Sequence, residues 1–172
     1  MFDFIEKIDI KILKYISDNL NNRFLNKIMP KITALGDLGL IWIVIGFLFI
    51  SNIDYREIGK LIFLALILTT IVGEGVIKHI VRRKRPFIKR EGQNLLITEP
   101  ITHSFPSGHT ASSFAVAAVF IRNESGISLL ICLIAILIGY SRIYLKVHYP
   151  SDVLGGAIIG YFCGYWVTTI LS

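Results

Sequence analysis

The sequence predicts an all-α fold: a polytopic membrane helix bundle with five transmembrane spans, preceded by an N-terminal amphipathic helix at the membrane interface. Hydrophobic residues make up 53% of the 172 residues and charged residues only 17%, and the mean hydropathy is +0.64. A soluble globule of this size has too little interior to bury so much apolar surface, whereas a bilayer accepts it. The apolar residues also fall into separate runs, divided by short polar, glycine or proline segments.

Residues 1–23 carry apolar side chains at helical spacing but are too charged to cross a bilayer. The periodic positions are Phe2, Ile5, Ile8, Ile12 and Ile16. Lysines and acidic residues lie between them, so we expect an amphipathic helix lying in the membrane interface. A polar cap packed on the bundle is the alternative. Acidic residues near the N-terminus, without an apolar core there, argue against a cleavable signal peptide.

The first two spans are expected at about 32–50 and 59–80. Asp37 makes the start of the first span polar. The second contains Glu74 and Lys78, which lie one helical turn apart. Ionisable residues inside a membrane usually face a partner or a wet cavity. An ion pair between these two residues and a functional site are both consistent with that pattern.

Three further spans are expected at about 107–121, 127–141 and 153–171. A long polar segment at 82–106 precedes them. The last span carries Gly156, Gly160 and Gly164 at four-residue spacing, which lets helices approach closely. We expect this ridge to pack within the bundle, with a dimer face as the alternative. The chain is predicted to form a single domain, residues 1–172.

The net charge of +6 and the positions of the two cysteines indicate which kinds of ligand and site to expect. The basic residues cluster beside apolar runs, which favours anionic lipid headgroups or a phosphate ligand over nucleic acid. Cys132 and Cys163 both lie inside apolar runs, so neither a disulfide nor a thiolate metal site is expected. These patterns leave the oligomeric state open.

Six ionisable residues from different segments are predicted to meet at one face of the bundle. They are Lys78, Arg85, His109, Arg142, His148 and Asp152. With five alternating spans, the ends of the second and fourth spans and the starts of the third and fifth lie on the same side. The topology therefore gathers cations, imidazoles and a carboxylate that are scattered along the sequence.

The residue types at this face suit phosphoryl chemistry. Asp152 follows His148 by four residues, so a helical turn would place a carboxylate beside the imidazole. The carboxylate would fix the tautomer and raise the basicity of the ring, as a nucleophile or base requires. Ser107 and Gly108 follow Pro106 at the start of a span, where unpaired backbone N–H groups form a cradle for an anion.

The remaining ionisable residues complete this chemistry. His109, at the rim of the cradle, is placed to give a proton to a leaving group. Lys78, Arg85 and Arg142 would neutralise a phosphate, and the arginine fork matches two oxygens at once. For residues 141–152 taken alone, an ordinary polar loop between helices is the alternative.

Three blocks of this face resemble the tripartite motif of the phosphatidic acid phosphatase type 2 superfamily. They are Lys78-x6-Arg85-Pro86, Pro106-Ser107-Gly108-His109 and Ser141-Arg142-x5-His148-x3-Asp152. All three occur in order and with the expected spacing, over residues 78–152. The resemblance implies a helical membrane phosphatase that needs neither metal nor cofactor.

The family pattern also assigns roles to these positions. It implies that His148 forms a phosphohistidine intermediate, with Asp152 beside it, and that His109 protonates the leaving oxygen. The positions that hold the phosphoryl group are Lys78, Arg85, Ser107, Gly108 and Arg142.

Hydrolysis of a lipid phosphate or pyrophosphate is therefore the expected function. Among the substrates of similar small bacterial enzymes, undecaprenyl pyrophosphate is our first expectation, ahead of phosphatidylglycerophosphate, phosphatidic acid and lipid A phosphate. Vanadium haloperoxidases resemble the family in the same motifs, but they are large soluble proteins, against which the apolar spans argue. A non-enzymatic lipid-phosphate binder or transporter is a further class, which would need the anion cradle without the complete catalytic set.

We expect an integral protein of the bacterial inner membrane with its site on the extracytoplasmic face. The charge distribution points the other way. In the five-span topology, all 18 Lys and Arg residues except Arg56, Lys60 and Arg122 lie on the site face, which the positive-inside rule would place in the cytoplasm. The extracytoplasmic expectation rests on the resemblance, and some of these cations would serve an anionic substrate.

Other polar residues near the motifs are expected to have lesser roles. His79 would point away from Lys78 on a helix and is interpreted as structural. His103 is expected to be a solvated loop residue, with substrate contact as the alternative. The basic residues 82–84 are expected to face lipid headgroups. We also hypothesise that Glu74 holds Lys78 ready while the site is empty.

Overall fold

The computed structural model describes residues 2–89 and 95–171, and the regular structure of these residues is helical throughout. The α-helices are α1 (Phe2–Asn19), α2 (Arg23–Leu35), α3 (Leu40–Ser51), α4 (Arg56–Thr70), α5 (Lys78–Val81), α6 (Gly108–Arg122), α7 (Ser128–Tyr144) and α8 (Pro150–Leu171). Two 3₁₀ turns, η1 (Asp37–Gly39) and η3 (Pro86–Lys89), and a π-helical stretch, η2 (Ile71–Ile77), connect them. The predicted all-α class is confirmed for the described residues.

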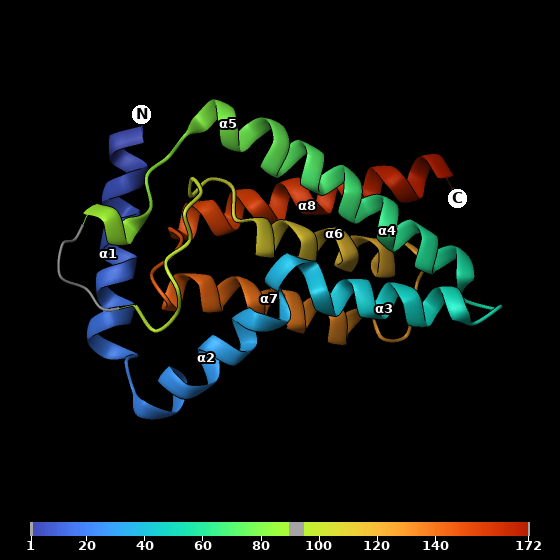
Figure 1. Cartoon of the computed structure of the whole chain (residues 1–172), viewed down its shortest axis with the longest axis horizontal. Helices are drawn as coiled ribbons and strands as arrows, with labels where there is room; N and C mark the ends of the chain where they lie inside the picture. Colours follow the sequence, from blue (N-terminus) through green and yellow to red (C-terminus); the bar gives the residue numbers. More distant parts are fainter. Residues whose placement is uncertain (1, 90–94, 172) are drawn as a thin grey trace.

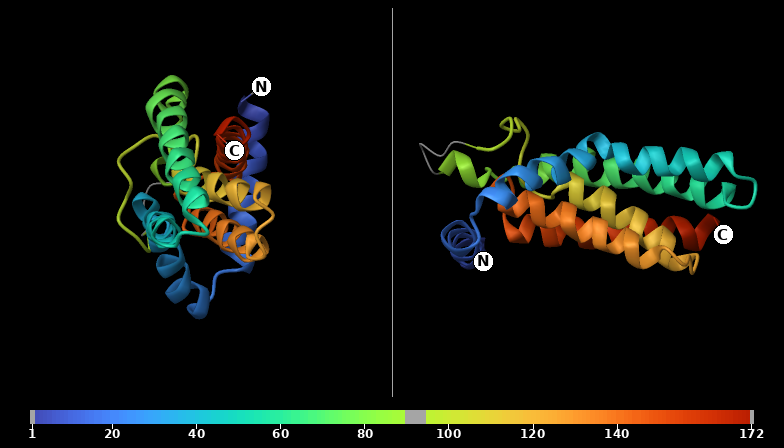
Figure 2. Two further views of the ribbon diagram at one scale, coloured as in Figure 1. Left: turned by 90° about the vertical axis from the view of Figure 1, so that its right-hand side faces the viewer. Right: turned by 90° about the horizontal axis from the view of Figure 1, so that it is seen from below.

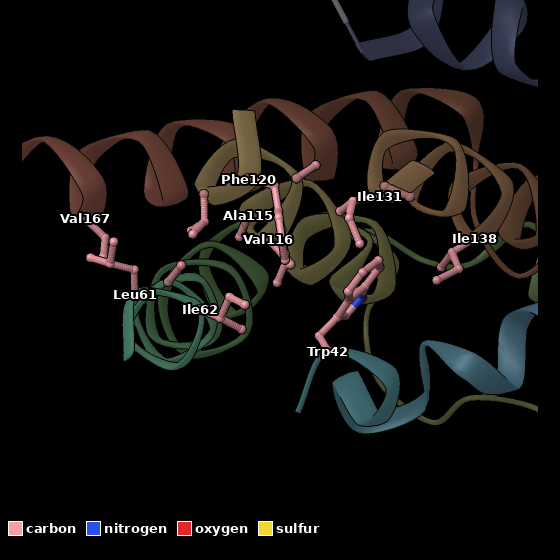
Figure 3. Packing of buried hydrophobic residues seen from close by; sticks show 13 residues of the cluster. Trp42, Leu61, Ile62, Ala115, Val116, Phe120, Ile131, Ile138 and Val167 are labelled. Carbon is pink, nitrogen blue, oxygen red and sulfur yellow. The ribbon is translucent and has the colours of Figure 1, made fainter. Parts of the chain in front are cut away.

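Helix α6 lies at the centre of the bundle, packed along α8 and flanked by α4 and α7 (Figure 1). Helix α3 runs beside α4, and α1 lies across one end of the bundle (Figures 1 and 2). The side chains of Trp42, Ile62 and Phe120 are fully buried and turn toward the same interior (Figure 3). Trp42 Nε1 also donates to Ser113 Oγ at 3.0 Å, which fixes α3 against α6.

The glycine ridge of α8 packs against α6, as predicted. A Cβ at Gly156, Gly160 or Gly164 would overlap a backbone carbonyl of α6 or of the residue that precedes it. The carbonyls belong to Ser107, Ala111 and Ala115, in that order. Because only glycine leaves room for this approach, the ridge sets the distance between α6 and α8.

The predicted count of five spans is wrong by the criteria of length and composition. Among the described residues, two helices are long and apolar enough to cross a membrane, Arg56–Val81 and Pro150–Leu171. The bent pair α2 and η1–α3 makes a third if it counts as one span. Helix α6 has 15 residues and α7 has 17. At 1.5 Å per residue they reach about 22 and 26 Å, short of a hydrocarbon core about 30 Å thick.

The predicted span at 32–50 also crosses a bend of 46° between α2 and α3. The backbone turns left-handed at Leu38, with φ of 51°, and at Gly39, with φ of 71°. A new helix then begins at Leu40. Beside this bend, Asp37 contacts His109 at the start of α6, and Thr33 contacts Arg142 at the end of α7.

Helix α1 confirms the helix predicted for the N-terminal segment. Its buried face consists of Asp9, Leu13 and Ile16, which lie toward the bundle. Phe4 and Tyr15 remain 70% and 62% exposed. The helix covers the end of the bundle at which α5, α6, α7 and α8 present the predicted site residues (Figure 1).

Candidate active site

Residues from all three motif blocks gather around one cavity of about 630 Å³. Six of the eight predicted site residues line it: Lys78, Arg85, Gly108, His109, Arg142 and His148. The other two, Ser107 and Asp152, are fully buried outside the lining. The predicted convergence of these segments on one site is thus present in the fold.

His148 lies in the turn between α7 and α8, and its two ring nitrogens have different partners. Arg85 Nη1 lies 3.2 Å from Nε2, and Asp152 Oδ2 lies 3.6 Å from Nδ1. The second distance is long for a hydrogen bond, and Nδ1 has no hydrogen-bond partner among the described residues. With the Arg85 guanidinium donating to Nε2, the neutral ring carries its proton on Nδ1, toward the carboxylate.

Burial keeps this imidazole neutral. Loss of solvation, opposed by Asp152 and reinforced by the charges of Arg85 and Arg142, lowers the pKa of His148 to about 3. An unprotonated Nε2 retains the lone pair that a nucleophile needs. The ring is therefore in the chemically competent state at neutral pH.

Arg85 is held by backbone and side-chain oxygens from two other segments. Its Nε donates to the Thr102 carbonyl at 2.7 Å and its Nη1 to the Val147 carbonyl at 2.8 Å. Nη2 donates to Thr102 Oγ1 at 3.1 Å. Burial lowers the pKa of Arg85 to about 10, so the guanidinium stays charged at neutral pH. Thr102 thereby contributes to the site through the arginine.

The other two cations have different partners. Lys78 Nζ lies 2.6 Å from Glu74 Oε1, which is the ion pair considered for the second span. Arg142 Nη1 donates to Thr33 Oγ1 at 2.6 Å, while its buried Nε lacks a partner among the described residues. Both residues are buried, with exposed fractions of 6% for Lys78 and 4% for Arg142. Three buried cations against one lining carboxylate make the cavity suitable for an anion.

The start of α6 supplies the cradle and the second imidazole. The Ser107 backbone N–H donates to the Asp152 carbonyl at 3.1 Å, so it is already used. The N–H groups of the first helical turn, from Gly108 onward, have no acceptor within the helix. A Cβ at Gly108 would meet the Glu74 carboxylate, which is the movable end of a long side chain. His109 Nε2 lies 2.8 Å from Asp37 Oδ1, and this fixes the orientation of the ring.

Arg83 corrects one sequence-based expectation. It was expected to face lipid headgroups, but its guanidinium turns inward between two carboxylates, Asp152 and Asp9. The expected roles of two histidines agree with their positions. His79 is exposed, with Nδ1 3.0 Å from the Glu74 carbonyl, and the exposed His103 does not line the cavity.

Four contributors were not assigned a role by the sequence analysis. They are Asp9, Thr33, Asp37 and Thr102. Only Asp9 left a usable signal, because it occupies the same helical face as the apolar residues Leu13 and Ile16. A carboxylate on the buried face of an amphipathic helix requires a cationic partner.

The PAP2 superfamily model matches residues 59–172, which is more than half of the chain. The chain belongs to the PAP2 superfamily. This confirms the resemblance, and all three motif blocks lie inside the matched range. Helices α1, α2 and α3 precede it, so Asp9 and Asp37 are contributed from outside the PAP2 match.

Curated PAP2 relatives share moderate identity with this chain. It is 29% identical to the undecaprenyl-diphosphatase of Sulfolobus acidocaldarius over 133 residues, which is 77% of this chain and 64% of that protein. It is also 29% identical to phosphatidylglycerophosphatase B of Bacillus subtilis over 153 residues, 80% of this chain and 70% of that protein. The chain spans 64%, 41% and 55% of the length of three curated relatives that it matches.

Two solved structures share the fold over nearly the whole chain. The crystal structure of Aquifex aeolicus LpxE has a TM-score of 0.81 and 32% identity, covering 93% of this chain and 94% of that one. A transmembrane PAP2-type phosphatidylglycerolphosphate phosphatase from Bacillus subtilis has a TM-score of 0.78 and 26% identity, covering 96% and 85%. The helix bundle therefore has the architecture of transmembrane PAP2 phosphatases.

Proposed function

We propose that this protein is a membrane lipid phosphatase that hydrolyses a lipid phosphate or pyrophosphate through a phosphohistidine at His148. One observation carries the proposal. The neutral His148 ring lies at the cavity wall with Nε2 beside the Arg85 guanidinium and Nδ1 beside Asp152. A nucleophile, a phosphate-binding cation and an orienting carboxylate are thereby placed on one ring.

In the first step, His148 Nε2 attacks phosphorus and the bond to the leaving oxygen breaks. The Arg85 donor passes from Nε2 to a phosphoryl oxygen, which frees the lone pair. His109 takes up a proton when the anionic substrate binds beside it and gives that proton to the leaving oxygen. Asp152 stabilises the charge that develops on the His148 ring. Lys78, Arg85 and Arg142 offset the charge on the non-bridging oxygens.

In the second step, water attacks the phosphohistidine and the P–N bond breaks. His109, now without its proton, accepts one from this water, and phosphate leaves. The His148 ring returns to its neutral form. Together the two steps return the enzyme to its starting state and require no metal, oxidant or reductant.

The cavity also offers an apolar wall for a lipid chain. Ile43 of α3 and Phe63, Leu66 and Ile67 of α4 also line the cavity. A free phosphate would gain little from such a wall, whereas an acyl or prenyl chain would bury apolar surface against it. We propose undecaprenyl pyrophosphate as the first substrate, supported by the named diphosphatase relative. Phosphatidylglycerophosphate is the second, supported by the phosphatidylglycerophosphatase likeness.

We further propose that α1 lies in the interface of the inner membrane, with the site facing the extracytoplasmic side. Phe4 and Tyr15 offer exposed apolar surface, and Lys7 and Lys11 are exposed beside them. Such a helix binds anionic headgroups through its lysines. A cysteine introduced at the exposed Lys84 tests the orientation: labelling by an impermeant maleimide in intact cells agrees with the proposal, and labelling only after lysis contradicts it.

Phosphate release by the purified protein in detergent with excess EDTA tests the function. The panel holds undecaprenyl pyrophosphate, phosphatidylglycerophosphate, phosphatidic acid and lipid A, with His148→Ala as the inactive variant. His79→Ala is the matched control, because His79 is exposed and outside the cavity. We expect EDTA-resistant turnover that His148→Ala abolishes and His79→Ala retains. Silence on every lipid, from protein shown to be folded, would refute the proposal and leave a binder or transporter.

A further inference from the structure

Arg83 joins a second carboxylate, on α1, to the carboxylate beside His148. Its Nη1 donates to Asp152 Oδ1 at 2.6 Å, and its Nη2 donates to Asp9 Oδ2 at 2.7 Å. Ser151 completes the cluster, since its backbone N–H donates to Asp9 Oδ1 at 2.9 Å. One guanidinium therefore connects α1 to the start of α8.

This cluster is buried and rigidly held. The side chains of Asp9 and Asp152 are 3% and 0% exposed, and that of Arg83 is 16% exposed. The guanidinium also stacks over the Tyr149 ring, 4.0 Å from its centroid. Although burial opposes the charge, the two carboxylates raise the pKa of Arg83 above its ordinary value. Buried ion networks add little net stability, so geometry is the better reason for this one.

Arg83 determines which way the Asp152 carboxylate faces. It takes Oδ1, while the Tyr149 backbone N–H donates to Oδ2 at 2.9 Å. With both oxygens engaged, the carboxylate cannot rotate, and Oδ2 stays 3.6 Å from His148 Nδ1. Asp9 holds the other half of the guanidinium fork, so Arg83 itself is fixed.

We infer that Asp9 and Arg83 are positioning residues that hold Asp152 against His148, which makes α1 a working part of the site. The inference rests on the proposed function of His148. Asp9 lies outside the range of the family match, so this is a feature of the N-terminal helix. Arg83 also balances the charge of Asp152, which sets how strongly the carboxylate attracts a proton onto His148.

The alternative is that the cluster only fastens α1 to the bundle. Helix α1 has other anchors, including buried Leu13 and Ile16 and a hydrogen bond from Lys146 Nζ to Ser17 Oγ at 2.9 Å. The helix is therefore expected to stay docked when Asp9 or Arg83 is altered conservatively. A fastening role would change the melting temperature and leave turnover per folded molecule unchanged.

The test compares Asp9→Asn, Arg83→Gln and the double variant, with Lys84→Gln as the matched control. Lys84 is exposed and loses the same charge. We expect kcat to fall about ten- to a hundredfold in both single variants with little change in KM, because a misplaced catalytic group costs rate in that range. The double variant should lose no more than Arg83→Gln, because Asp9 acts through Arg83. Unchanged kcat, or losses that multiply in the double variant, would overturn the inference.

A second readout needs no turnover. ¹⁵N-histidine NMR in micelles, assigned with His148→Ala, reports the tautomer and acid titration of His148. The charged groups that face this ring are Asp152, Arg85 and Arg142, and all three remain in the variants. Removing Arg83 leaves the negative charge of Asp152 without its cationic partner, so the titration midpoint of His148 should move to higher pH. Lys84→Gln should not move this midpoint.

The two readouts separate the two proposals. If the midpoint moves but no lipid is turned over by the wild type, the positioning stands and the proposed function fails. If lipid is turned over while neither kcat nor the midpoint responds to Arg83→Gln, the positioning alone fails.

Discussion

Replacing Gly156 with alanine is expected to move the two helix ends that build the site. The new Cβ would lie 2.6 Å from the Ser107 carbonyl oxygen. A carbon–oxygen contact relaxes at about 3.3 Å, so α6 and α8 must separate by roughly 0.7 Å at this point. The Ser107 N–H also donates to the Asp152 carbonyl at 3.1 Å, so the same shift moves the anion cradle away from the carboxylate of the site.

This displacement should lower both kcat and the melting temperature. A misplacement of about 1 Å costs on the order of a hundredfold, so roughly 0.7 Å should lower kcat about twentyfold. Overpacking should also destabilise the fold by about 1–3 kcal/mol, or about 2–12 °C in a chain of this size. The measurements are kcat on the lipid that the panel identifies and the apparent melting temperature in detergent, followed by tryptophan fluorescence.

Gly164→Ala is the matched control, because its Cβ would overlap the Ala115 carbonyl in the same way. It lies eight residues further along α8, about 12 Å from Gly156. We expect a comparable loss of melting temperature with kcat changed less than about twofold, since the geometry at the site end is kept. Equal loss of kcat in both variants, per folded molecule, would refute the argument that local α6–α8 spacing controls the site.

Two further predictions concern ionisable groups of the site. Glu74→Gln should raise KM several-fold and alter the pH profile, because that carboxylate holds Lys78 Nζ at 2.6 Å; if neither quantity changes, the pair has no part in binding. In acid, unfolded histidine binds a proton near pH 6.5, whereas burial holds folded His148 neutral down to about pH 3. The free energy of unfolding therefore decreases as the pH is lowered through that window, by up to about 1.4 kcal/mol per pH unit. His148→Gln removes this contribution, so its melting temperature should fall less steeply than that of the wild type between pH 6.5 and about 4.5; parallel slopes would contradict the assignment.

The helices were predictable because the apolar runs end at strong local signals. The predicted 153–171 and 127–141 segments correspond to α8 and α7, whose observed ends lie within three residues of the prediction. The break at Leu38 was not predictable, since a left-handed leucine has no local sequence signal. The count of spans failed for a different reason. Apolarity indicates burial in lipid and burial in protein equally, and most of α6 is buried among the other helices.

The parts of the site that depend on short spacings in the sequence were predictable. The parts that depend on contacts between distant segments were not. His148 and Asp152 lie four residues apart, so their proximity followed from local geometry. Asp37 meets His109 across 72 positions of sequence, and neither its type nor its neighbours indicate that contact. The inward turn of Arg83 was missed because a basic run beside a membrane span normally faces headgroups.

Three residues within or beside the motif positions have partners among the first 37 residues, before the range matched by the family. The pairs are Asp9 with Arg83, Thr33 with Arg142 and Asp37 with His109. The motif blocks thus supply the reactive and charged groups, while the N-terminal helices fix the orientation of one group at each of three helix ends. A buried ionisable group left without its partner shifts its pKa or its position. If His148 acts as proposed, we therefore expect variants of Asp9, Thr33 and Asp37 to change turnover, although all three residues lie outside the motif range 78–152.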